Sequence, residues 1–178
     1  VSKTISITIV QDTIDELDET FTIGLSNPTN AAISDNSATV TITDDEGTPT
    51  LSIANVTTSN ENPANLTATV TLSAVSSRTV TVDYATANST ATAAADYTAA
   101  SGTLTFNPGE TTKTLDVTIL ADIVDEENET FTVALSSPTN AAVSISSGTA
   151  TMTITDDDAA PTISISDVAS AETAGVKN

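Results

Sequence analysis

The chain has 178 residues with 24 Asp and Glu against four Lys and Arg, a formal net charge of −20, and it contains no cysteine and no histidine. This charge excludes nucleic acids and anionic membrane surfaces as partners, because the chain cannot neutralise their phosphate groups. The missing cysteine and histidine exclude disulfide bonds, the common transition-metal sites and the usual Ser-His and Cys-His nucleophile pairs.

Apolar residues alternate with Thr and Ser along most of the chain, and this period of two predicts half-buried antiparallel strands. The chain lacks a helical stripe, and it lacks the run of about 18 apolar residues that would predict membrane insertion. The close spacing of strands and turns predicts an all-β sandwich with a mainly aliphatic core. In chain order, the apolar residues of the predicted strands are Ile5, Ile7 and Ile9; Phe21, Ile23 and Leu25; Val40 and Ile42; Leu51 and Ile53; Ala68, Val70 and Leu72; Val80, Val82 and Tyr84; Leu104 and Phe106; Leu115, Val117 and Ile119; Phe131, Val133 and Leu135; Met152 and Ile154; Ile163 and Ile165.

The chain also repeats itself. Residues 3–53 return as residues 113–165, with about three-fifths of the positions identical, at an interval of roughly 110 residues. We therefore expect residues 1–47 to be the C-terminal half of one repeat, residues 48–158 to be a complete repeat, and residues 159–178 to be the first strand of the next repeat.

Acidic residues gather in two short runs of the complete repeat. The run Asp122–Glu129 lies between two predicted strands, and the run Asp156–Asp158 follows the last strand. Antiparallel strands can bring both runs to the same end of a sandwich. Two carboxylates about 4 Å apart repel by up to about 4 kcal/mol at an effective dielectric near 20, so a bound cation is expected. Several flexible oxygen ligands favour Ca²⁺ over Mg²⁺.

The alternative is that these acids are solvated turn residues, as most charge runs are. The incomplete first repeat nevertheless carries the same arrangement, although the two copies differ at many other surface positions. This recurrence favours a cation site. The acids of the first copy are Asp12, Asp15, Glu16, Asp18, Glu19, Asp44, Asp45 and Glu46.

Six segments of the complete repeat resemble, in order, the Calx-beta family, a calcium-binding module known from sodium–calcium exchangers and many large bacterial surface proteins. The resemblance implies tandem seven-stranded antiparallel β-sandwiches of immunoglobulin-like type, with calcium bound where one sandwich meets the next. The matching segments are residues 49–53 (PTLSI), 83–86 (DYAT), 96–106 (DYTAASGTLTF), 107–111 (NPGET), 122–135 (DIVDEENETFTVAL) and 150–158 (ATMTITDDD).

The resemblance also implies a set of calcium ligands in each copy. Two positions depart from the family pattern: Ala121 stands where the best calcium-binding members have a further acid, and Glu61 lies one place out of register for an opening-strand glutamate. Fewer ions or weaker binding should follow. The implied ligands are Asp96, Asp122, Glu126, Glu129, Asp156, Asp157, Asp158 and the Val124 carbonyl in the complete repeat, and Asp12, Glu16, Glu19, Asp44, Asp45 and Glu46 in the first.

These observations predict a calcium-binding structural or adhesive repeat of a large secreted or cell-surface protein of bacterial type, and not an enzyme. The expected partners are neighbouring repeats of the same chain or other copies of the protein, and a cell-surface or carbohydrate ligand is a further candidate. The alternative is a self-assembling extracellular filament whose incomplete terminal sandwiches are completed by neighbouring chains. A glycosidase would need one acid in an apolar pocket, whereas these acids lie in polar runs.

Overall fold

The structure, a computed structural model, describes residues 2–58, 60–61 and 65–169. Strands and connecting segments make up this part of the chain, and no helix occurs in it. Within it there is accordingly no helix long and apolar enough to cross a membrane. In chain order the strands are β1 (Glu19–Gly24), β2 (Ser37–Ile42), β3 (Thr50–Ile53), β4 (Val56–Thr57), β5 (Asn65–Leu72), β6 (Val80–Asn88), β7 (Ser101–Phe106), β8 (Thr112–Thr118), β9 (Glu129–Thr139), β10 (Ala142–Val143) and β11 (Thr149–Ile154).

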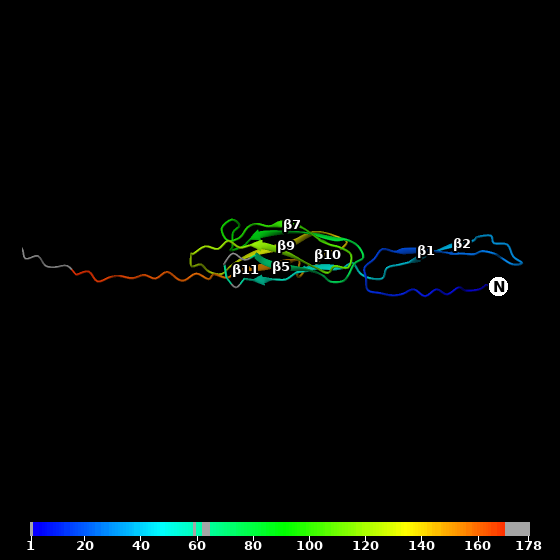
Figure 1. The fold of residues 1–178 in the computed structure, drawn as a ribbon, viewed down its shortest axis with the longest axis horizontal. Helices are drawn as coiled ribbons and strands as arrows, with labels where there is room; N and C mark the ends of the chain where they lie inside the picture. Colours follow the sequence, from blue (N-terminus) through cyan, green and yellow to red (C-terminus); the bar gives the residue numbers. More distant parts are fainter. Residues whose placement is uncertain (1, 59, 62–64, 170–178) are drawn as a thin grey trace, which may run out of the picture.

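Strands β3 to β11 form a sandwich of two sheets in the middle of the elongated molecule (Figure 1). One sheet has the strand order β10-β3-β5-β8 and the other β4-β11-β9-β6-β7. The pairings are antiparallel except for the two-residue contacts of β10 with β3 and of β4 with β11. The seven longer strands confirm the predicted all-β sandwich, and the short strands β4 and β10 are additions that the alternation did not predict.

The core lies between the two sheets because each strand buries alternate residues. In β5, for example, Leu66, Ala68, Val70 and Leu72 are buried, and the residues between them are exposed. Full burial of an aliphatic side chain contributes about 1.5–3 kcal/mol, so this alternation is the main source of stability. Every buried hydrophobic residue of the described chain lies between residues 51 and 154, so the sandwich has a core of its own.

The N-terminal part of the chain is the hairpin of β1 and β2, with residues 2–10 running beside it (Figure 1). The strand predicted around Ile5 and Ile9 is not formed there, and Ile5 is 63% exposed. The repeat explains the difference. The equivalent strand β8 pairs with β5, and the described part of the first copy contains no counterpart of β5.

The strand predicted around Ile163 and Ile165 is likewise absent, and both side chains are fully exposed. Its equivalent, β3, is held between β5 and β10 in the sandwich. Residues 159–169 have no such neighbours in the described structure, and they extend away from the end of the sandwich opposite the hairpin (Figure 1).

Candidate metal centres

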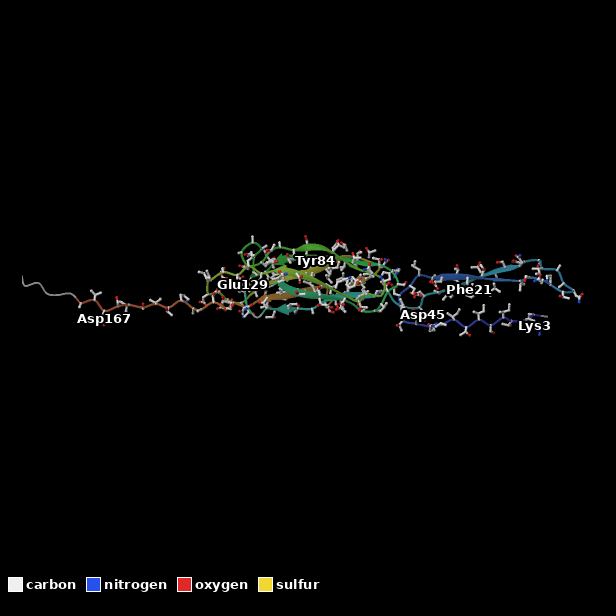
Figure 2. All side chains as sticks on the ribbon, viewed as in Figure 1. Lys3, Phe21, Asp45, Tyr84, Glu129 and Asp167 are labelled. Carbon is white, nitrogen blue, oxygen red and sulfur yellow. The ribbon has the colours of Figure 1, made fainter. Side chains whose placement is uncertain are left out.

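The acidic runs lie at the two ends of the sandwich along the long axis of the molecule. Figure 2 shows Glu129 near one end and Asp45 at the opposite end, where the hairpin joins. The first end combines the connection from β8 to β9 with the exit of β11. The antiparallel topology therefore brings the two acidic runs of the complete repeat together, as the sequence predicted.

Carboxylates at this end form two groups of three. Oxygen atoms of Glu61, Asp156 and Asp158 lie within 4.8 Å of one another, and so do oxygen atoms of Asp96, Glu126 and Glu129. Together the two groups contain five of the acids that the Calx-beta resemblance implies as ligands, and they add Glu61. The predicted positions Asp122, Val124 and Asp157 are not members of either group.

Local hydrogen bonds fix the chain that carries these acids. Asp122 Oδ1 accepts a hydrogen bond from the Val124 amide at 2.7 Å, which closes a turn at the start of the acidic loop. Asn128 Oδ1 accepts one from the Asp156 amide at 3.1 Å, and so connects the loop to the exit of β11. The Leu120 amide donates to the Asp96 carbonyl at 2.9 Å. The carboxylates are thus held together by turns and strand ends, although they repel one another.

Two features of this end, at Glu61 and Asp158, indicate that its carboxylates suit a bound cation. Asp158 Oδ2 is buried and has no hydrogen-bond partner in the described structure. Burial, followed by the charges of Asp156, Asp122 and other nearby acids, raises the pKa of Glu61 to about 7. A buried oxygen without a partner is costly, and a group of hard oxygen atoms is the donor set that Ca²⁺ prefers. The residues therefore fit a calcium ion.

Glu61, which the sequence places one position out of the family register, lies among these acids in the structure. Its side chain is only 6% exposed, and its amide donates to Asp157 Oδ1 at 3.3 Å, so the backbone brings it beside the exit of β11. One sequence signal could have identified it, since Glu61 is the only acid between Ile53 and Asp83. The departure at Glu61 therefore does not reduce the number of carboxylates at this end.

The opposite end repeats the same local structure with the acids of the first copy. Asp12 Oδ1 accepts from the Ile14 amide at 2.8 Å, as Asp122 does from Val124. Asp18 Oδ1 accepts from the Asp44 amide at 3.0 Å, as Asn128 does from Asp156. The recurrence in sequence is thus a recurrence of the same turn and the same connection to a strand end.

The carboxylates of the first copy are less tightly grouped. Within the described residues, no three of them come as close together as those at the other end. Asp12, Glu16, Asp44, Asp45 and Glu46 nevertheless line one shallow hollow. Burial, followed by neighbouring carboxylates, raises the pKa of Glu16 and of Glu46, and Glu19 is among the neighbours of Glu16. This end therefore shares the electrostatic character of the other but lacks a counterpart of Glu61 in the described chain.

We expect metal-free protein to become more stable as the pH falls from about 8 to about 5.5. The folded-state pKa of Glu61, about 7, lies above its ordinary value of 4.5, so in this window the folded state binds more protons than the unfolded state. Stability is therefore lost as the pH rises through 7. Melting temperatures in chelator across this range would show the trend, and Glu61→Gln should flatten it. A melting temperature that falls with decreasing pH would contradict this assignment.

A family model described as the Calx-beta domain matches residues 1–46 and 49–158 of the chain. Sodium/calcium exchanger 1 of Mus musculus is 43% identical over 99 residues, a match that covers 46% of this chain and 10% of the exchanger. The chain therefore spans about a tenth of the length of that relative.

Solved structures have the same fold as the sandwich. The apo-form Calx CBD1 domain aligns with a TM-score of 0.58 and 26% identity, covering 63% of this chain and 100% of that one. The calcium binding domain CBD12 of CALX1.1 aligns with a TM-score of 0.56 and 27% identity, covering 61% of this chain and 46% of that one.

Proposed function

The chain belongs to the Calx-beta domain family, and from this premise we propose that it is a calcium-binding structural or adhesive repeat of a large extracellular protein. The observation that carries the proposal is the close group of Glu61, Asp156 and Asp158, in which Asp158 Oδ2 is buried without a partner. The similarity to a structure described as a calcium binding domain supports the choice of ion.

The residues proposed to hold calcium in the sandwich are those of the two carboxylate groups, together with Asp122, the Val124 carbonyl and Asp157. A bound calcium ion would supply the positive charge that these acids lack. The acids themselves come from four separate parts of the chain, namely the segment before β5, the connection from β6 to β7, the loop between β8 and the start of β9, and the exit of β11. Holding them together would therefore order that end of the sandwich.

Each acidic end also lies next to a connection between units. Asp44–Glu46 precede the buried residue Pro49, where the sandwich begins, and Asp156–Asp158 precede Pro161 in the same way. We propose that calcium stiffens these connections, since repelling carboxylates would otherwise loosen them. Extracellular modules bind calcium with Kd values of about 10⁻⁴–10⁻³ M, which suits partly exposed sites like these and an extracellular or cell-surface location.

Calcium should slow amide hydrogen exchange in the loops at residues 11–18 and 121–128. The metal-free loops contain repelling acids that open them, and a bound ion removes the repulsion. Exchange measured by mass spectrometry in chelator, in calcium and in an equal concentration of magnesium would test this. Magnesium is the matched control because it demands stricter octahedral geometry. Equal exchange in all three conditions would remove the support for a stiffened connection.

A second candidate is a self-assembling extracellular filament whose incomplete terminal sandwiches are completed by neighbouring chains. The exposed apolar side chains of Ile5, Ile163 and Ile165 favour it, because unpaired extended segments of this kind invite strand addition. Sedimentation velocity at several protein concentrations separates the two candidates. Polymers that grow with concentration would support the filament, and a monomer at all concentrations would oppose it.

A further inference from the structure

One acid of the N-terminal loop is bound by the sandwich rather than by its own loop. Asp15 is 2% exposed, and both of its carboxylate oxygens accept hydrogen bonds from Arg78 Nη2, at 2.6 and 2.8 Å. Arg78 Nε donates to Asp15 Oδ2 at 3.2 Å, and Ser76 Oγ donates to the same oxygen at 2.6 Å. Bidentate pairs of this kind are among the stronger and more specific polar contacts in proteins.

The backbone makes the same contact. The Asp15 amide donates to the Val75 carbonyl at 3.1 Å, and the Ser77 amide donates to the Asp15 carbonyl at 2.9 Å, so the two segments form a one-residue parallel bridge. Asn140 supports the arginine from within the sandwich, because its Oδ1 accepts from Arg78 Nη1 at 3.4 Å. The turn at residues 75–78, which we call the receptor turn, therefore forms a binding site for one aspartate of the preceding loop.

The second acidic loop presents the same aspartate at the other end of the sandwich. Asp125 occupies the position of Asp15, three residues after Asp122 as Asp15 is three residues after Asp12. The two loops share their first turn and their connection to a strand end. In the described structure, however, Asp125 is exposed and makes no side-chain hydrogen bond.

We propose that Asp125 is the docking point for a further Calx-beta unit beginning at Pro161, which binds it through a Ser-Xaa-Arg turn equivalent to residues 76–78. The spacing supports this occupant, since Pro161 follows Asp156 at the interval at which Pro49 follows Asp44. Charge supports it as well. The loop at residues 122–129 carries five acids and no basic residue, and the receptor turn supplies an arginine.

The contact would then recur once at every connection between units. Because it joins the front of one unit to the back of the next, it is a head-to-tail contact that propagates along a row with one fixed orientation. It uses no proposed calcium ligand for its hydrogen bonds, so it stands whether or not the acidic ends bind calcium. The aspartate–arginine ion pair would then align successive units, in addition to any bound ion.

The test compares the Asp15 and Asp125 amides by hydrogen exchange in chelator. In the 178-residue chain, we expect the Asp15 amide to exchange at least about tenfold more slowly than the Asp125 amide, because only the former is bonded. The second step lengthens the chain, so that residues 1–160 are followed by residues 49–178. The added unit carries its own complete core, since every buried hydrophobic residue of the described chain lies between residues 51 and 154.

In the lengthened chain, the Asp125 amide should become as protected as the Asp15 amide. Changing the added unit's arginine to Gln, or Asp125→Asn, should return it to fast exchange while the protection at Asp15 is unchanged. Asp125 is exposed, so its substitution leaves the sandwich core intact. An Asp125 amide that stays fast in the lengthened chain, or that stays protected in both variants, would overturn the proposal. Because chelator is present throughout, a failure of calcium binding would leave this result unaffected.

Discussion

Saturating calcium should raise the melting temperature of metal-free protein by roughly 10 °C, and changing Asp156, Asp157 and Asp158 together to Asn should abolish most of that rise. A ligand at a hundredfold excess over its Kd stabilises the folded state by about 2.7 kcal/mol, and 1 kcal/mol moves the melting temperature of a domain of this size by about 4 °C. Thermal unfolding followed by circular dichroism, with and without calcium, would measure both effects.

The same triple substitution should raise the melting temperature in chelator. It removes three negative charges from an end of the sandwich where, among the described residues, no basic side chain forms an ion pair with them. The control is the double substitution Asp83→Asn with Asp116→Asn. These two acids lie on strands β6 and β8, outside the carboxylate groups, and each accepts a hydrogen bond from a threonine hydroxyl. A control protein that also loses the calcium response, or a triple variant that keeps it, would contradict the assignment of the site to the exit of β11.

Replacing Phe131 by Ala should destabilise the sandwich by about 3–5 kcal/mol. Phe131 is 0% exposed and stacks on Tyr97 with ring centroids 4.1 Å apart, so truncation leaves a cavity between the two sheets. Tyr97 cannot easily move into the space, because its hydroxyl donates to Asn88 Oδ1 at 2.7 Å. A loss of this size is a large part of the stability of a domain of about 110 residues.

Phe21→Ala provides a control at the equivalent position of the first copy. Phe21 lies on β1 and is only partly buried, outside the core of the sandwich. Urea unfolding of the sandwich should therefore change little in this variant, and much in the Phe131 variant. Equal losses at the two positions would mean that the hairpin and the sandwich unfold as one cooperative unit, against the separate core seen in the structure.

The longer strands of the sandwich could be predicted from the sequence because their buried residues alternate with exposed ones, as in β5 and β8. The segments around Ile5 and Ile163 have the same alternation, yet they are not strands in the structure. Alternation reports which face of a segment is apolar, whereas strand formation requires a hydrogen-bonded neighbour. The described structure contains no such neighbour for either segment.

Only part of the candidate site could be predicted from the sequence. The acids after β8 and β11 stand in dense runs, and the repeat places both runs twice. Glu61 stands alone in the sequence, so only the folded backbone shows that it joins Asp156 and Asp158. The ion pair between Asp15 and Arg78 could not be predicted either, because the two residues lie 63 residues apart in different copies of the repeat.

Both tyrosines of the chain take part in the packing of the sandwich. Tyr97 lies in the core, stacked on Phe131, and Tyr84 packs against Gly102, where an added Cβ would lie 3.1 Å from the tyrosine hydroxyl oxygen. Both rings are therefore explained by packing, and the carbohydrate ligand stays a prediction without a site.

Calorimetric titration of calcium into chelator-treated protein at physiological salt would show whether the acidic ends bind calcium. We expect saturable binding with a Kd of about 10⁻⁴–10⁻³ M, which is weakened by Glu61→Gln and lost from the sandwich in the triple Asn variant. The absence of saturable binding up to several millimolar calcium would contradict it, and the acidic ends would then be solvated turns.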